Sequence, residues 1–278
     1  MTRRRGLSSL TPMKALLLYP EFSALGFWNY KDVCHLLGAK YPASPLGLIT
    51  MAALPRMQGA SACPRVVITG DFFTRFSPFF MEGVAELYAE RSIILKPVDL
   101  GDLLLYGAYH GVAETASTWG LKPGGLALAR ACMRIFQPDG KDYLRKWAGY
   151  QAERWYEQHC RGLFLRTGLL VAGPNDVSLL FQKAAEHVSP AIYGEAIPTI
   201  GKGLDADSEG YDGIIVIGPF NCLPHRISEA SLKPLSLRRG MPVLTYESDG
   251  YAVSPSFLRQ VDVHIQQVLE HAARSPQL

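Results

Sequence analysis

Short apolar runs alternate along the chain with longer stretches in which apolar residues recur at helical spacing. The runs that predict strands are rich in Val, Ile and Leu: 15–19 (ALLLY), 65–70 (RVVITG), 92–100 (SIILKPVDL), 213–218 (GIIVIG) and 241–250 (MPVLTYESDG). Mostly unbroken apolar strands are typical of a parallel sheet that helices cover on both faces. We therefore predict an α/β fold, a Rossmann-like parallel sheet flanked by helices, arranged in two lobes.

Helical spacing and terminal signals place helices between these strands. Asn175 is the expected N-cap of one helix, and Ser254 is expected at the start of the last helix, 254–273. Pro234 is expected to interrupt or end the helix that begins at 224. Further helices are expected at 46–54, at 79–90 and over most of 124–161.

A turn-rich stretch at 56–64 (RMQGASACP) separates two regions of different composition. We therefore expect residues 1–60 to form a short strand–helix segment and residues 61–278 to form the α/β body. Ligands of parallel sheets bind beyond the carboxyl ends of the strands. Three predicted strand ends carry distinctive residues, TGDFFTR, GPFNCLP and ESDG, and we expect them to converge at one edge of the sheet.

Composition excludes several classes of protein. The formal net charge of +3 is small and comes partly from the N-terminal arginines, which argues against a nucleic-acid groove. No apolar run approaches the roughly 20 residues of a membrane helix, and the N-terminus lacks the apolar core of a signal peptide. The five cysteines are odd in number and form no C-x-x-C pair, which argues against a disulfide framework. We expect a cytoplasmic protein without a nucleic-acid or membrane partner.

The stretch IGPFNCLPHR places a single thiol, Cys222, between an apolar strand and a predicted helix start. Backbone N–H groups and the helix dipole at that position favour a thiolate, which is the form that binds a soft metal or an iron–sulfur cluster. The alternative is a small buried packing residue, a common role of free cysteine. Cys132 and Cys160 lie in helical contexts that favour packing, and the spacing of Cys34 and Cys63 demands no ligand role.

Other candidate residues leave two interpretations open. Arg75 follows a strand end and could meet an anionic group such as a CoA phosphate, or it could pair with Asp71 or Glu82 at the surface. His225 could donate a hydrogen bond near Cys222, or it could be an exposed residue at a helix start. The DADSEG stretch at 205–210 imitates half of a calcium-binding loop, but the twelfth position falls on Val216, so we interpret it as a solvated turn. No phosphate-binding glycine motif is present.

The C-terminal part resembles a known family. Gly194-Glu195, Asp212-Gly213, Pro219-Phe220-x-Cys222-x-Pro224 and Asp249-Gly250 resemble the pattern of the 2-hydroxyacyl-CoA dehydratase D-component family, in its branch of CoA-substrate-specific activase-related proteins. RVVITGDFFTRFSPFF resembles the strand–turn–helix that opens the preceding domain of that family. The resemblance covers about residues 64–273.

The resemblance implies a chemistry. The family's matching cysteine binds a four-iron four-sulfur (4Fe-4S) cluster, so Cys222 becomes a candidate metal ligand, with Gly218, Pro219 and Arg75 as further cofactor-binding candidates. The implied activity is low-potential electron transfer in anaerobic metabolism, in which an ATP-dependent activator supplies an electron and the dehydratase removes water from a 2-hydroxyacyl-CoA. The chain would be a dehydratase-like lyase or an activase accessory, with an activator or dehydratase subunit as partner and an acyl-CoA as ligand.

The family's upstream cluster cysteines are missing, so the ligand set is incomplete in this chain. The alternative is a cluster-free α/β binding module or accessory subunit, and a homodimer could supply ligands from another chain. Residues 14–55 resemble the extreme N-terminus of cobalamin-binding radical-SAM proteins, which gives a weaker alternative. That segment has no D-x-H-x-x-G motif, and no C-x-x-x-C-x-x-C motif follows it.

Overall fold

The structure is a computed structural model that describes residues 63–76, 84–98, 100–165, 176–192, 194–251 and 253–274, with the side chains of 100, 160–165 and 235–236 excepted. The strand predicted at 15–19, the helix at 46–54, Cys34 and most of the 56–64 junction lie outside these residues, as do the side chains of Cys160 and Glu82. No described helix is both long enough and apolar enough to cross a membrane.

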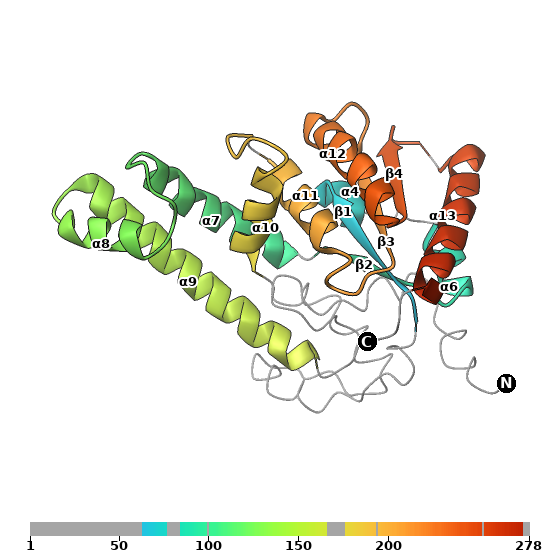
Figure 1. The fold of residues 1–278 in the computed structure, drawn as a ribbon, viewed down its shortest axis with the longest axis horizontal. Coiled ribbons are helices and arrows are strands. Elements are labelled where there is room, and N and C mark those ends of the chain that lie inside the picture. Colours follow the sequence, from blue (N-terminus) through green and yellow to red (C-terminus); the bar gives the residue numbers. More distant parts are fainter. Residues whose placement is uncertain are drawn as a thin grey trace.

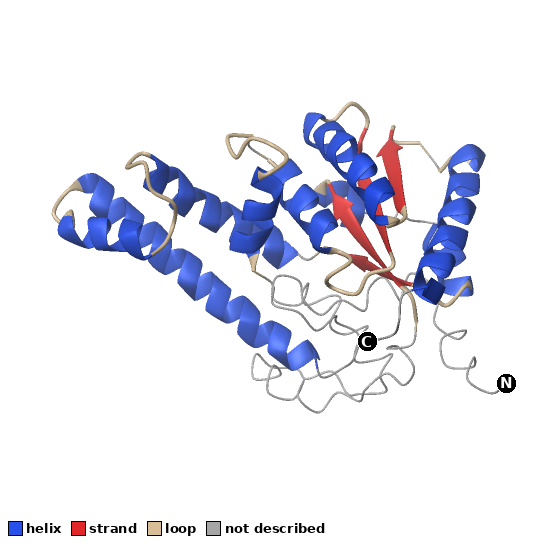
Figure 2. Ribbon diagram, in the orientation of Figure 1, coloured by secondary structure: helices blue, strands red, loops and turns tan. Residues whose placement is uncertain are grey.

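The described strands form one parallel sheet, which confirms the predicted α/β class. β1 (Arg65–Gly70), β2 (Ile94–Pro97), β3 (Gly213–Pro219) and β4 (Val243–Ser248) pair in the order β2-β1-β3-β4. β1 and β3 are therefore the two inner strands, with β2 and β4 at the edges. Figure 2 shows the strands in red among the helices in blue. Because all strands run the same way, their carboxyl ends share one edge of the sheet, as the sequence predicted for three of them.

Successive side chains of a strand point to opposite faces of the sheet, so alternate residues of the central strands pack in two different hydrophobic cores. Val66 and Ile68 face α6 (Val84–Glu90) and α13 (Pro255–Arg274), whereas Val67 faces the opposite core. That second core is built on α7 (Leu100–Ser117), α10 (Val177–Ala185), α11 (Ala196–Asp205) and α12 (Leu223–Arg239). Helices thus cover both faces, which explains why β1 and β3 are unbroken apolar runs (Figure 1).

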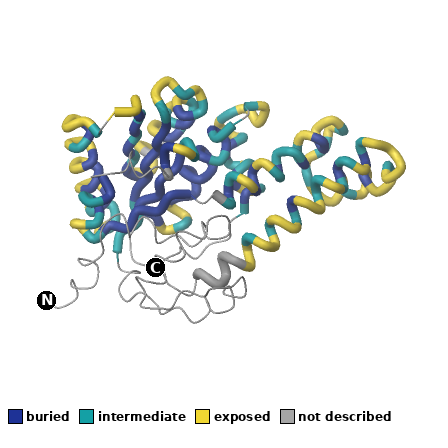
Figure 3. Tube along the Cα trace, turned by 180° about the vertical axis from the view of Figure 1, so that it is seen from behind, coloured by how far each residue is buried: buried dark blue, intermediate teal, exposed yellow. Residues whose placement is uncertain are grey.

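Three helices form an arm that projects from the sheet. α7 packs along the long helix α9 (Pro138–Leu165), and α8 (Gly125–Met133) packs on α9 at the far end (Figures 1 and 3). The small buried residues Ala127 and Ala131 form the inner face of α8. The prediction of a mostly helical stretch over 124–161 is confirmed, whereas the helix over 100–117 was not predicted.

Several predicted boundaries are corrected. The N-cap of α10 is Asp176, not Asn175, because the Asp176 carboxylate accepts a hydrogen bond from the Ser178 backbone N–H at 3.0 Å. α12 continues through Pro234 instead of ending there. Ser254 caps α13 as predicted, accepting from the Phe257 N–H at 3.2 Å. Of the helix predicted at 79–90, residues 84–90 are described and helical.

The buried helix α11 was not predicted, because its sequence AIPTIGKGLD contains residues that usually break helices. Its glycines allow close packing instead. A Cβ at Gly201 would lie 2.5 Å from the Leu180 carbonyl oxygen, and one at Gly203 would lie 2.5 Å from a methyl carbon of Leu232. α11 therefore fits between α10 and α12, and it brings Glu195 to the carboxyl edge of the sheet.

Candidate functional site

The order of the strands creates a topological switch point at the centre of the sheet. The chain leaves β1 toward β2 on one side, and it leaves β3 toward β4 on the other side. Connections that diverge in this way open a crevice beyond the carboxyl ends of the two central strands, which is where open α/β sheets bind ligands. The carboxyl edge is defined here as residues 70–76, 194–195, 219–229 and 247–251, and it contains the candidate site (Figure 1).

The loop after β1 is fixed by its own side chains. Asp71 accepts hydrogen bonds from the backbone N–H and the hydroxyl of Thr74, at 2.7 and 2.6 Å, and so starts the short helix α4 (Phe72–Phe76). Gly70 has a φ of 113°, and a Cβ there would lie 2.0 Å from the Ile217 carbonyl oxygen. Only glycine fits this approach between β1 and β3.

Glu195 supports the same loop from the start of α11. Both of its carboxylate oxygens accept from the Phe72 N–H, at 3.0 and 2.9 Å. Burial raises the pKa of Glu195, while the Phe72 hydrogen bond and the charge of Arg75 oppose that shift. A side-chain hydrogen bond to Asp71 raises it further, so two carboxyl groups lie in contact at the end of β1.

Arg75 is buried and faces inward. Its guanidinium donates to the Gly70 carbonyl oxygen at 2.6 Å, and only 4% of the residue is exposed. Burial lowers the pKa of Arg75, and the charges of Glu195, Asp102 and Asp71 oppose the shift. The surface pairing considered as the alternative from the sequence is therefore replaced by a buried cluster that includes Asp71. Contact with a CoA phosphate stays a prediction, and it would require this side chain to turn outward.

Cys222 lies half-buried at the start of α12. Its N–H donates to the Pro219 carbonyl oxygen at 3.2 Å, and its carbonyl oxygen accepts from the Arg226 N–H at 3.0 Å. The preceding Asn221 adopts a φ of 57°, and its N–H donates to the Glu247 carboxylate at 2.6 Å. Glu247 also pairs with Arg226. The thiol therefore sits on a turn that β4 holds in place.

His225, three residues further on, is buried. The interpretation of it as an exposed residue at a helix start is therefore wrong. It is 3% exposed, and neither ring nitrogen has a hydrogen-bond partner within the described part of the chain. Burial lowers the pKa of His225, and the nearby carboxylates of Glu229 and Glu247 oppose the shift. The imidazole is therefore neutral near pH 7, with one nitrogen able to donate and the other able to accept.

The sequence candidates Gly218 and Pro219 end β3 beneath this residue. Gly218 makes room for the imidazole, and Pro219 forms the last pair of the ladder with Ser248. The sequence clue to a buried side chain over β3 was the glycine of the Gly-Pro pair. Glycine at a strand end often lets another side chain pack closely against the strand. Nothing in the sequence pattern showed that the approaching side chain would be His225.

The other described thiols lie elsewhere. Cys63 comes just before β1, at the amino edge of the sheet, so the length of a six-residue strand, roughly 20 Å, separates it from the carboxyl edge. Cys132 is exposed on α8. Among the described residues no group of three or more His, Cys, Asp or Glu side chains is arranged to hold a metal ion. Two acidic residues of the DADSEG turn, Asp205 and Glu209, form ion pairs with Lys183 and Lys202, so that turn is less solvated than predicted.

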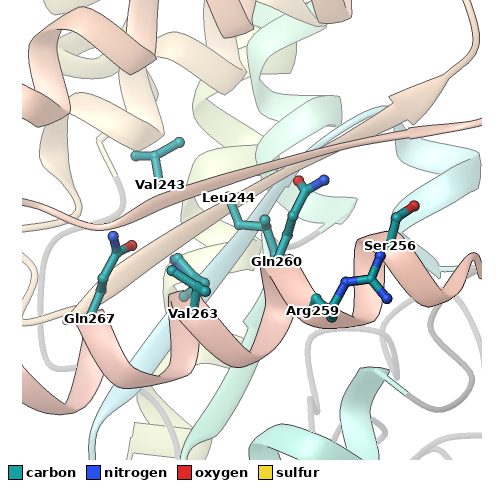
Figure 4. Close-up of a pocket in the computed structure, with 8 residues that line it drawn as sticks. Val243, Leu244, Ser256, Arg259, Gln260, Val263 and Gln267 are labelled. Atoms are coloured by element: carbon teal, nitrogen blue, oxygen red, sulfur yellow. The ribbon is translucent and has the colours of Figure 1, made fainter.

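A groove of about 390 Å³ lies away from this edge, between β4 and α13 (Figure 4). Its lining includes Arg259, Gln260, Val263 and Gln267, and Figure 4 shows these side chains projecting from one helix. His264 lies beneath it, 1% exposed, with Nδ1 2.6 Å from the Tyr88 hydroxyl. The groove is open and presents no convergent set of chemically reactive groups.

Comparison with known proteins gives no match: neither a family model, nor a curated protein, nor a solved structure is similar to this chain. The resemblances to the dehydratase family and to radical-SAM proteins stay predictions.

Proposed function

We propose that the protein is a cluster-free α/β binding module that holds an acyl-CoA at the carboxyl edge between β1 and β3. The class of ligand comes from the dehydratase resemblance around Cys222. The place comes from the fold, because the switch point is where open parallel sheets bind their ligands.

The observation that carries the proposal is His225. A buried polar side chain without a hydrogen-bond partner costs free energy, on the order of 1–3 kcal/mol. Its presence here therefore points to a ligand or a water molecule that forms the missing hydrogen bond. His225 lies at the switch point, and burial keeps it neutral. A neutral imidazole can donate to the carbonyl or hydroxyl oxygen of an acyl group while its second nitrogen accepts from another donor.

The neighbouring residues give this site a fixed frame. Asp71 and Glu195 hold the loop after β1 through hydrogen bonds to Thr74 and Phe72, and Glu247 holds the loop after β3. A site whose polar groups are already held in place loses less conformational entropy on binding.

The described residues do not fit a complete iron–sulfur site. A 4Fe-4S cluster is normally held by cysteine thiolates, and Cys222 is the one thiol of the described residues at this edge. We therefore prefer a cluster-free binding module to an iron–sulfur protein.

A second candidate keeps the cluster, and the half-buried position of Cys222 at the switch point favours it. In that case Cys222 would hold the cluster together with ligands from beyond the described residues or from another chain, and the cluster would supply low-potential electron transfer. The chain itself would hold the Cys222 turn through Glu247 and Arg226.

Iron analysis of anaerobically purified and reconstituted protein separates the two candidates. The cluster-free proposal predicts no iron above background in the wild type. Iron present in the wild type, lost in Cys222→Ser and kept in Cys63→Ser would establish the cluster protein instead. Cys63→Ser is the matched control because that thiol lies at the opposite edge of the sheet.

A further inference from the structure

The far end of the arm exposes large apolar side chains. Leu126, Met133 and Phe136 are 77, 79 and 92% exposed, and with Ala129 they recur at helical spacing along the outer face of α8 and the turn that follows it. The inner face of the same helix is occupied by packing on α9. The solvent-facing side of a helix is normally polar, so an apolar stripe on that side indicates a contact surface.

The same end of the arm carries concentrated positive charge. The arm tip, residues 118–148, contains six Lys and Arg residues and two Asp residues, which gives +4. The whole chain has a net charge of +3, so all other residues together carry −1. Both acids of the arm tip are already engaged, Asp139 with Arg134 and Asp142 with Arg145 and Lys146. The surface is therefore apolar with a cationic surround.

The carboxyl edge also exposes apolar side chains, but the charge around them is negative. Phe73, Phe220 and Leu223 follow the two central strands and are 72, 68 and 70% exposed. Around them lie five carboxylates, Asp71, Glu195, Glu229, Glu247 and Asp249. Against these stand three cations, Arg75, Arg226 and the Lys233 that pairs with Glu229, so the local charge is −2. Apolar side chains beside the candidate site are thus surrounded by negative charge.

We propose that the arm tip of one copy docks on the carboxyl edge of a second copy. The tip of a chain lies at the far end of its own arm from the sheet, so the contact is made between chains (Figures 1 and 3). Opposite charges steer the two surfaces together, and the apolar side chains of both lose contact with water. When the arm tip of each copy binds the carboxyl edge of the other, the two contacts are equivalent and form a closed two-fold dimer.

The partner then contributes a residue to the site. Cys132 is exposed on α8, next to Met133 of the docking face, and docking brings it to the edge that presents Cys222. The second copy would cover the ligand crevice and add a thiol beside it. This inference deepens the proposed function by naming what closes its site, but the contact itself requires no ligand.

A mixing experiment with the ligand-free full chain tests the contact. A short bis-maleimide is added to the wild type, to Cys132→Ser, to Cys222→Ser and to an equal mixture of the two variants at low salt. The proposal predicts a linked dimer in the wild type and in the mixture but not in either variant alone, with a peptide joining Cys132 to Cys222. A dimer linked equally in Cys132→Ser alone, or no Cys132–Cys222 peptide in the wild type, overturns it.

Light scattering then checks the docking surfaces without any cysteine chemistry. Met133→Ser/Phe136→Ser is expected to raise the dimer dissociation constant at least about tenfold, because hot-spot apolar residues dominate interfaces. Leu237→Ser is the control, since Leu237 is an equally exposed apolar residue outside both surfaces. Added salt should weaken the wild-type dimer by screening. A monomer at all concentrations, or a dimer unaffected by the double variant, contradicts the contact. Either result leaves acyl-CoA binding and iron content to be judged by their own measurements.

Discussion

The imidazole of His225 fills the space that Gly218 leaves by lacking a side chain. A Cβ at position 218 would lie 2.6 Å from Cγ of His225, closer than real Cβ atoms approach. Gly218→Ala must therefore displace the histidine or shift β3. We expect a loss of about 1–3 kcal/mol in the free energy of unfolding, measured by urea titration, together with weaker ligand binding. Gly107→Ala is the control, because nothing lies within 4 Å of a Cβ there. Equal stability of the two variants would show that His225 is not fixed by this contact.

Two buried histidines make the stability of the protein depend on pH. Burial lowers the pKa of His264 from 6.5 to about 4 and lowers that of His225 as well. In the unfolded chain both take up a proton near pH 6.5, whereas the folded protein resists protonation. Stability is therefore full above pH 6.5 and falls as the pH drops toward 4, by up to about 1.4 kcal/mol per pH unit for His264, and His225 adds a loss of the same sign. Urea midpoints at pH 7.5, 6 and 5 should show this slope, and His264→Gln should flatten it. A slope that is unchanged in His264→Gln would refute the assignment.

Glu195 is expected to be a stabilising residue of the site. Removing its carboxylate leaves the Phe72 N–H without this acceptor and takes one of three nearby carboxylates from the buried Arg75. Glu195→Ala should lower the free energy of unfolding by about 2–4 kcal/mol. The exposed Glu90 at the end of α6 provides the control, and Glu90→Ala should stay within about 0.5 kcal/mol. Similar urea midpoints for both variants would mean that the Glu195 contacts contribute little.

The Lys202–Glu209 ion pair anchors the buried helix α11. Their charged atoms are 2.8 Å apart, and the lysine side chain is 2% exposed. Glu209→Ala leaves a buried ammonium without its partner and should cost about 3–5 kcal/mol. The double variant Lys202→Met/Glu209→Leu should lose less, because it leaves no buried ammonium without its ion-pair partner. The exposed pair of Arg274 with Glu270 is the control, and Glu270→Ala should cost less than about 1 kcal/mol. If the double variant is the less stable of the two buried-site variants, this account of α11 is wrong.

The sequence predicted the parts of the fold whose patterns are local. β1 and β3 are buried on both faces, so they appear as uninterrupted Val and Ile runs, and Ser254 marks the start of α13 by its own hydrogen bond. The meeting of three strand ends at one edge followed from the parallel arrangement of the strands.

Features that depend on packing could not be predicted in this way. Gly201 and Gly203 suggest a loop until Leu180 and Leu232 are seen against them. Because α11 was not recognised, the role of Glu195 was not either. The burial of His225 depends on the depth at which α12 packs over Gly218, a relationship between segments that residue spacing does not contain.

The central claim is that His225 at the switch point contacts an acyl-CoA. Calorimetric titration of iron-free, anaerobically prepared protein with a 2-hydroxyacyl-CoA tests it most directly, with His225→Gln and the exposed-site control His159→Gln beside the wild type. The account predicts saturable binding that weakens about tenfold or more in His225→Gln and stays unchanged in His159→Gln. No binding to the folded wild type, or equal affinity in folded His225→Gln, would contradict it.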